Sequence, residues 1–331
     1  MEKRMQLTDS RKIPVRTVAA SATGAVTVGP IAGACRGGRD GTGDCRCLLR
    51  EIHIRVALFA VAVVALLIGY HTLLFERAPA IFNSPTEDMS FGWYVPLFSL
   101  YVVWTERRKI VESVGPASIW GLFLIVPCAF AGFLGVRGAQ IRFEIVGLVG
   151  LLIGLVWTMF GARTARQVLF PALFLLFCIP LQSYLDIVTV HLRLMAVSAA
   201  YEILKGCGVD IVREGTMLFS PSGAFSIDVA DPCSGLRSLF AMMALTAGYS
   251  YFTQPTWFRR ALLFALAMPI AIVGNVVRVL SIVTVAATCS SDFATGFYHD
   301  YSGYVVFLVA VFLMVATGGL ITKGAERCAM S

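Results

Sequence analysis

The chain has 331 residues, of which 57% are hydrophobic and 14% are charged, and its mean hydropathy is +0.77. A soluble domain carries roughly 25% charged residues, so this composition excludes an ordinary water-soluble protein of this size. The net charge of +7 would indicate nucleic acid in a soluble protein. In a membrane protein the position of the charges matters more than their sum, and we expect no nucleic-acid partner.

The first 51 residues are polar and basic and lack a sustained apolar period, which predicts a disordered cytoplasmic tail. This tail is no secretory signal, because the first apolar core begins only after His53. Cys35, Cys45 and Cys47 fit no common zinc spacing, so we expect solvated thiols and no metal. The nine cysteines of the chain are odd in number and irregularly spaced, which argues against a disulfide framework.

Eight apolar runs follow the tail. Crossing a hydrocarbon core of about 30 Å takes about 20 helical residues. The runs lie at 54–75, 91–104, 117–135, 143–161, 168–186, 235–252, 261–288 and 303–321. They predict an all-α polytopic membrane protein with about eight transmembrane helices, comprising a membrane domain at 52–322 and a cytoplasmic tail at 323–331.

The positive residues indicate which side of the bilayer each loop occupies. With the N-terminus inside, the outer segments carry fewer basic residues than the short inner loops, which hold Arg107, Arg108, Lys109, Arg163, Arg166, Arg259 and Arg260. The opposite topology would invert nearly every loop. We therefore expect both termini in the cytoplasm and the long segment 187–232 on the outer side.

That outer segment has two parts. From Ile187 to Leu204 the mixed polar and apolar spacing predicts a helix along the membrane surface. From Asp210 to Val229 the sequence alternates and turns near Pro221, which predicts a short hairpin. This small extracytoplasmic helix-hairpin insertion leads directly to Cys233, and such a cap over a membrane site could receive a peptide.

Cys233 stands at the start of the sixth apolar run, within the sequence Asp-Pro-Cys-Ser-Gly-Leu-Arg-Ser of residues 231–238. A helix start carries a partial positive charge, which stabilises a thiolate over a thiol. Arg237 lies four residues on, on the same helical face. Cys233 is therefore a candidate nucleophile, and the alternative is a small buried hydrophobe.

Two further residues are expected at the same depth. Arg278 is 18 residues beyond Arg260, which at 1.5 Å per residue is about 27 Å, close to the full hydrocarbon thickness. His299 precedes the eighth run, also on the outer side. An intramembrane arginine is a functional candidate, although Arg278 could instead snorkel to headgroups and His299 could be an interfacial histidine. Asn275, one turn before Arg278, could serve the same site or join helices.

Together the three residues predict acyl transfer. A thiolate attacks a peptide carbonyl, a histidine moves the proton, and a guanidinium stabilises the oxyanion or orients the substrate. A transporter would line a path through the midplane, whereas these residues gather at one face. A thiol oxidoreductase would need a paired cysteine, and neither Cys207 nor Cys289 forms a Cys-x-x-Cys pair. A non-catalytic protein that binds a sorting signal stays open.

Three ordered blocks resemble the signature blocks of the exosortase/archaeosortase family. They are Cys-Ser-Gly-Leu-Arg-Ser at 233–238, Asn-Val-Val-Arg at 275–278 and Gly-Phe-Tyr-His-Asp-Tyr-Ser-Gly at 296–303. Two weaker blocks lie at 90–101 and 213–215, and the resemblance covers about 52–321. The Asp-Pro pair at 231–232 departs from the dipeptides of the commonest bacterial members, which bears on the subfamily and not on the nucleophile.

The resemblance implies a membrane cysteine protease or transpeptidase without a cofactor. Its partners would be exported proteins with a PEP-CTERM-like sorting signal, made of a recognition motif, a transmembrane helix and a basic cluster. By position, Cys233 matches the nucleophile, Arg278 the essential arginine, and His299 a histidine typical of the bacterial branch. A bacterial inner membrane with the site facing the periplasm follows. Supporting candidates in these blocks are Ser234, Arg237 and Asn275.

Overall fold

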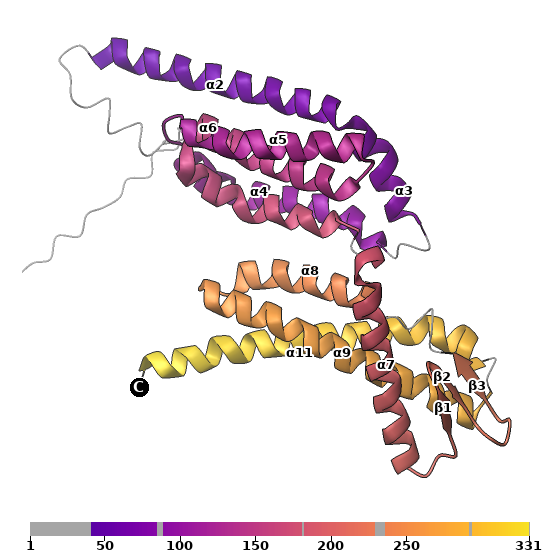
Figure 1. The fold of residues 1–331 in the computed structure, drawn as a ribbon. Coiled ribbons are helices and arrows are strands. Elements are labelled where there is room, and N and C mark those ends of the chain that lie inside the picture. Colours follow the sequence, from indigo (N-terminus) through magenta and orange to yellow (C-terminus); the bar gives the residue numbers. More distant parts are fainter. Residues whose placement is uncertain (1–40, 85–88, 181, 229–235, 291–292, 331) are drawn as a thin grey trace, which may run out of the picture. The chain divides into compact units, whose positions relative to one another are not determined.

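The computed structural model describes residues 41–84, 89–180, 182–228, 236–290 and 293–330, and apart from three short strands the regular elements there are helices (Figure 1). Among these residues, five helical segments are long and apolar enough to cross a membrane, namely Arg50–Gly69, Ile119–Arg137, Ile141–Cys178, Trp257–Thr288 and Ala294–Gly324. An all-α membrane architecture is thus confirmed, while the count of eight spans stays a prediction.

The helices before residue 180 form what we call the N-terminal helical group. It consists of α2 (Gly41–Gly69), η1 (Leu73–Arg77), α3 (Ala78–Phe82), η2 (Ser90–Trp93), α4 (Tyr94–Glu112), η3 (Ile119–Gly121), α5 (Leu122–Arg137), α6 (Ile141–Phe174) and η4 (Leu175–Cys178). Helix α2 begins inside the segment expected to be a tail. The apolar run at 91–104 becomes α4, which is helical but is not one of the five candidate spans.

Helices α5 and α6 lie side by side and approach closely through glycines (Figure 1). A Cβ atom added at Gly147 would lie 2.7 Å from the Cα atom of Gly132. Small residues of this kind allow helix backbones to meet in a membrane, where no hydrophobic effect drives the helices together.

Helix α6 is interrupted at Gly161, whose φ of 86° and ψ of 170° are not helical. Glycine adopts such a conformation without the steric penalty of a side chain. Ile145 and Val149 before the break and Phe174 after it belong to one buried cluster. The apolar runs expected at 143–161 and 168–186 are therefore joined by a kink, and the second run is broken after η4, so that its last residues belong to α7.

The remaining elements form the C-terminal group, which holds the predicted site. They are α7 (Gln182–Gly206), β1 (Val212–Glu214), β2 (Met217–Phe219), β3 (Ser226–Asp228), α8 (Leu236–Thr253), α9 (Trp257–Thr288), η5 (Ala294–Tyr298) and α11 (His299–Met330). The expected surface helix lies within α7. Where one hairpin was expected, the strands form an antiparallel sheet in the order β1-β2-β3.

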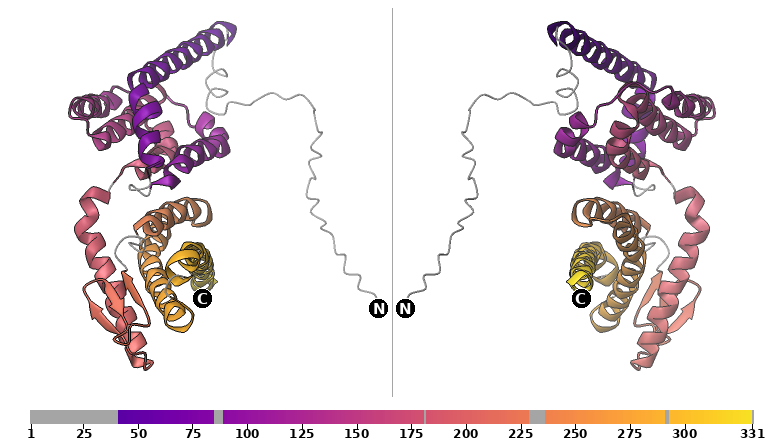
Figure 2. Two further views of the ribbon diagram at one scale, coloured as in Figure 1. Left: turned by 90° about the vertical axis from the view of Figure 1, so that its right-hand side faces the viewer. Right: turned by 90° about the vertical axis from the view of Figure 1, so that its left-hand side faces the viewer.

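We call α7 and the three strands the cap. Leu218, Phe225 and Ile227 of the sheet region are buried in one cluster with residues of α7 and α9, namely Val197, Ala200, Leu204, Val279, Ile282, Val283 and Ala286. The two side views show α7 and the strands beside α9, with α8, α9 and α11 grouped together (Figure 2). Burial of this apolar surface fixes the cap to the last third of α9.

A set of hydrogen bonds joins α8, α9 and α11 at the end away from the cap. Gln254, which is 1% exposed, donates from Nε2 to the Gly318 carbonyl and to the Thr322 hydroxyl, both at 3.2 Å. Arg260 donates from Nε to the Gln254 carbonyl at 2.8 Å. These bonds tie the end of α8 to α9 and α11.

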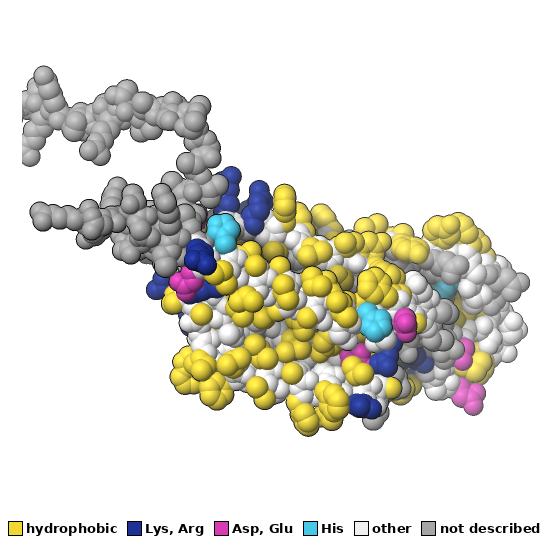
Figure 3. Space-filling view, turned by 90° about the horizontal axis from the view of Figure 1, so that it is seen from above, with side chains coloured by type: hydrophobic (Ala, Val, Ile, Leu, Met, Phe, Trp, Pro, Cys, Tyr) yellow, Lys and Arg dark blue, Asp and Glu magenta, His cyan; other side chains and the backbone are white. Residues whose placement is uncertain are grey.

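The outer surface of the helices is rich in apolar side chains. Figure 3 shows hydrophobic side chains over much of one face, with Lys and Arg side chains in a few small groups. Large side chains that are more than two-thirds exposed include Phe123, Phe312 and Leu320. An apolar surface of this extent is unusual for a soluble monomer and matches contact with lipid.

Candidate active site

Helices α9 and α11 bring Arg278 and His299 into contact. The Arg278 Nη2 atom lies 3.3 Å from the His299 Nε2 atom and donates to the His299 carbonyl oxygen, also at 3.3 Å. Both side chains are partly buried. Two residues that are 21 positions apart in the sequence thus share one site, as expected from their common depth.

The backbone around His299 is shaped for this contact. Element η5 contains a break at Gly296, with φ of −91° and ψ of −107°, and α11 begins at His299 itself. The Ser302 hydroxyl donates to the His299 carbonyl at 3.1 Å, so this oxygen accepts from both a serine and the Arg278 guanidinium. The Arg278 bond holds the first turn of α11 against α9, while the Ser302 bond lies within α11.

Gly303 leaves the space that the guanidinium occupies. A Cβ atom at this position would lie 3.1 Å from the Arg278 Nη2 atom and 3.2 Å from Cζ. Such distances are tighter than ordinary van der Waals contact, so a larger residue would displace the guanidinium.

A small cavity of about 30 Å³ lies among the three helices and reaches Arg278. Ser238 and Met242 from α8, Asn275 and Arg278 from α9, and Gly303 and Phe307 from α11 line it. This volume is enough for a water molecule or a few polar atoms of a substrate. Arg278 and Asn275 therefore face the same space as the first turns of α8.

The predicted site residues have different outcomes. Cys233 and Ser234 lie outside the described residues, and Arg237 is the second residue of α8. Asn275 lines the cavity together with Arg278. Sequence reasoning gave no role to Ser238 or Gly303. Two features of the sequence could have indicated them. Ser238 ends the block at 233–238 that contains Cys233, and Gly303 follows His299 by four residues, on the same helical face.

The site offers nitrogen donors, an imidazole ring and hydroxyls. In the part of the chain that the structure describes, no group of three or more His, Cys, Asp or Glu residues could hold a metal ion. A fixed guanidinium beside an imidazole can stabilise a developing oxyanion while the ring moves a proton. This arrangement fits acyl transfer.

Comparison with protein families finds one match, to the family described as transmembrane exosortase, over residues 83–316. The match spans more than two thirds of the chain and includes all three signature blocks. The chain belongs to the transmembrane exosortase family. Comparison with curated proteins and with solved structures returned no significant match. The resemblance drawn from the sequence blocks is thus confirmed, and this exosortase is a membrane protein of a family of sorting-signal peptidases or transpeptidases.

Proposed function

We propose that this exosortase is a cysteine peptidase or transpeptidase that cleaves C-terminal sorting signals at the outer face of the membrane. The contact between Arg278 and His299 carries the proposal, together with the small cavity that Arg278 and Ser238 line. Cys233 is five residues before Ser238 and five after Asp228 at the end of β3. Since five extended residues span at most about 18 Å, the chain length sets this as the largest separation between the Cα atoms of Cys233 and Ser238.

In the proposed reaction, the Cys233 sulfur forms a bond to the carbonyl carbon of the scissile peptide. The thiol proton moves to His299, and the carbonyl π electrons move to the oxygen, where Arg278 stabilises the negative charge. Collapse of this intermediate breaks the carbon–nitrogen bond, and His299 gives its proton to the leaving amine. A thioester on Cys233 remains.

A second nucleophile completes the cycle. Water, or the amine or hydroxyl of an acceptor, attacks the thioester carbon while His299 accepts its proton. The carbon–sulfur bond then breaks, and His299 returns the proton to the sulfur, which regenerates the Cys233 thiol. Water yields a free carboxyl terminus, and any other acceptor yields a joined product, so the two outcomes differ in mass at the new C-terminus.

The substrates in this proposal are exported proteins that carry a recognition motif, a transmembrane helix and a basic cluster. A helix held in the bilayer presents the motif at the outer interface, where we expect Arg278 from its distance along α9. The basic cluster stays on the inner side by the rule that orients the enzyme. We accordingly assign the protein to a bacterial inner membrane, with both termini inside and the site facing the periplasm.

The test compares the intact masses of surface and secreted proteins from cells with the native chain and with Cys233→Ala. We expect a set of proteins to retain a C-terminal hydrophobic segment in the variant, at unchanged levels of membrane-inserted enzyme. Cys207→Ala and Cys289→Ala are matched controls, because both thiols are free and exposed in the structure. These controls should process normally.

Unchanged C-termini in Cys233→Ala cells that express such substrates would refute the thiol mechanism. The chain would then be treated as a binding or transport protein, and Arg278 and His299 would be tested for movement of ions or solutes across vesicles.

A further inference from the structure

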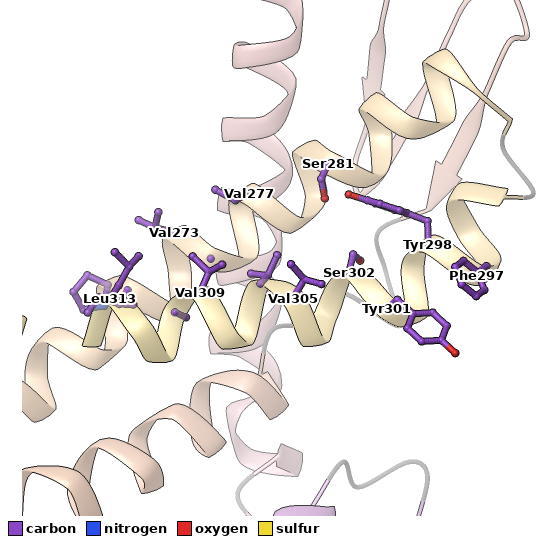
Figure 4. Close-up of a pocket in the computed structure, with 15 residues that line it drawn as sticks. Val273, Val277, Ser281, Phe297, Tyr298, Tyr301, Ser302, Val305, Val309 and Leu313 are labelled. Atoms are coloured by element: carbon purple, nitrogen blue, oxygen red, sulfur yellow. The ribbon is translucent and has the colours of Figure 1, made fainter. Parts of the chain in front are cut away.

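A long groove runs between α9 and α11 on the surface of the C-terminal group (Figure 4). Its volume is about 620 Å³. Val273 and Val277 of α9 form one wall, and Val305 and Val309 of α11 form the other (Figure 4). None of the residues that line the groove is charged. Its occupant must therefore be apolar along its length.

The dimensions of the groove match one face of a helix. On α9 it extends from Pro269 to Ser281, and on α11 from Tyr301 to Leu313. Each stretch covers 12 residue steps, which is about 18 Å of helix.

The wall residues follow helical spacing. Val273, Val277 and Ser281 are four residues apart on α9, and Tyr301, Val305, Val309 and Leu313 are four apart on α11. Two such rows form a trough in which the side chains of a third helix interdigitate. The four valines are between 49% and 60% exposed, so no described part of the chain covers them.

Polar groups occur at one end of the groove only. Ser281, Tyr298, Tyr301 and Ser302 carry the hydroxyls, and Figure 4 shows the Tyr298 ring extending toward Ser281. Ser302 is the residue that donates to the His299 carbonyl. The groove also shares Gly274, Val306 and Ala310 with the small cavity that Arg278 lines. The polar end of the groove therefore adjoins the candidate active site through Ser302, and the middle of the groove shares its wall with the small cavity.

We propose that this groove holds the transmembrane helix of the sorting signal while the adjoining segment is cleaved. The inference rests on the proposed function and adds the surface and residues that bind the substrate. The occupant must be apolar over about 18 Å and meets polar groups only at the end beside Arg278. A transmembrane helix directly preceded by the segment to be cleaved has these properties. Membrane lipid and a second copy of this chain are the other possible occupants, and the experiments separate them.

The first experiment fills the groove. Val305→Trp and Val309→Trp place a bulky ring in the trough, whereas Leu308→Trp and Phe312→Trp place it on α11 outside the groove, at positions that are 67% and 70% exposed. We expect the groove variants to lower the rate of sorting-signal removal at least tenfold and the controls to stay within twofold of the native rate. Equal membrane abundance and equal alkylation of Cys233 by a maleimide show that the site is intact. Groove variants that process at control rates would overturn the assignment.

The second experiment identifies the occupant in native membranes. A photoreactive diazirine amino acid about the size of leucine, which leaves the groove open, replaces Val305 or, as a control, Leu308 in the full-length chain that also carries Cys233→Ala. We expect crosslinks from Val305 to C-terminal hydrophobic segments of exported proteins, and far fewer from Leu308. Crosslinks from Val305 to lipid only, or to a second copy of this chain only, would contradict the proposal.

Failure of this inference and failure of the proposed function differ in outcome. If Cys233→Ala cells retain the C-terminal segments but the groove variants behave as the controls do, the groove assignment alone is wrong. If no segment is retained, the proposed function fails and the inference fails with it.

Discussion

Two arginines of this molecule illustrate how a charge is used inside a membrane protein. In the N-terminal helical group, Arg77 of η1 pairs with Glu144 of α6, whose side chain is 1% exposed. In the C-terminal group, Arg278 contacts a histidine ring and a backbone carbonyl. The first arginine neutralises a carboxylate, whereas the described contacts of the second are with an imidazole ring and a carbonyl oxygen. We infer that the first holds helices together and the second acts on substrate.

The packing around the two arginines agrees with this difference. Glu144 is pressed against Gly135, where an added Cβ atom would lie 2.6 Å from the Glu144 nitrogen and 2.7 Å from Cγ. Arg278 lines a cavity with room for a few polar atoms. Breaking a buried ion pair therefore costs stability, while changing the residue at a cavity costs activity.

Glu144→Ala should produce the largest change in stability. It leaves the partly buried Arg77 without its carboxylate, which should lower the free energy of unfolding by about 3 kcal/mol. Denaturant unfolding in detergent micelles measures the loss. The control is Glu51→Ala, which breaks the exposed pair with Arg55 and should cost less than about 1 kcal/mol. Equal losses of unfolding free energy in the two variants would show that the buried ion pair stabilises the protein no more than the exposed one.

Arg278→Lys tests the other side of the comparison. Lysine keeps the charge but lacks the planar fork, so we expect processing to fall about 100-fold to 1,000-fold, which is about 2.7–4 kcal/mol in the barrier. The free energy of unfolding should change by less than about 1 kcal/mol. Release of a tagged substrate from membranes gives the rate. Arg77→Lys, which can still pair with Glu144, should process at close to the native rate; a near-native rate for Arg278→Lys would reduce Arg278 to an anchor.

Gln254→Ala should lower the stability of the C-terminal group without changing its rate of processing. Its side-chain amide donates hydrogen bonds to Gly318 and Thr322 in the interior of the group. Loss of these hydrogen bonds should lower the free energy of unfolding by about 1–3 kcal/mol. The rate of processing per folded molecule should not change, because Gln254 lies at the opposite end of α8 from Ser238. Unfolding curves and substrate release from the same preparation give both quantities. A large fall in rate without a loss of stability would contradict this role.

Gly303→Ala should have the smallest effect. Alanine is the better helix former, so the stability of α11 should stay equal or rise. Its methyl group would displace the guanidinium by a few tenths of an ångström, and we expect processing to fall by roughly tenfold or less. Gly319→Ala, in open space on the same helix, is the matched control and should leave the rate unchanged. Identical rates for the two variants would show that the guanidinium position is not critical.

Composition and motif order predicted much of this architecture. The apolar runs became helices, because a backbone without water must bond to itself. The count of residues from Arg260 to Arg278 gave their separation along a single uninterrupted helix, and α9 is such a helix. The meeting of Arg278 and His299 was expected from their common depth and is found. The catalytic roles of Cys233, Arg278 and His299 stay predictions.

Other features could not be derived from the sequence. Arg77 and Glu144 are 67 residues apart, and no periodicity links them. The groove depends on which faces of α9 and α11 pair, and helices that are apolar all round carry no pattern that selects a face. The sequence predicts the end of an apolar run at Gly161 and a loop after it, whereas the structure has a kink within one helix. Glycine and basic residues occur at both loops and kinks, so the sequence alone does not distinguish them.

Three successive residues of α9 face three different surroundings. Val277 lines the groove, Arg278 reaches the small cavity, and Val279 is buried in the cluster that holds the cap. Each residue turns the helix by about 100°, so inserting or deleting one residue here would disconnect all three at once. Changes in chain length should accordingly be tolerated in the exposed turn between β2 and β3 and rejected in this stretch of α9. A single helical turn of α9 thus determines which residues face the groove, the small cavity and the cap.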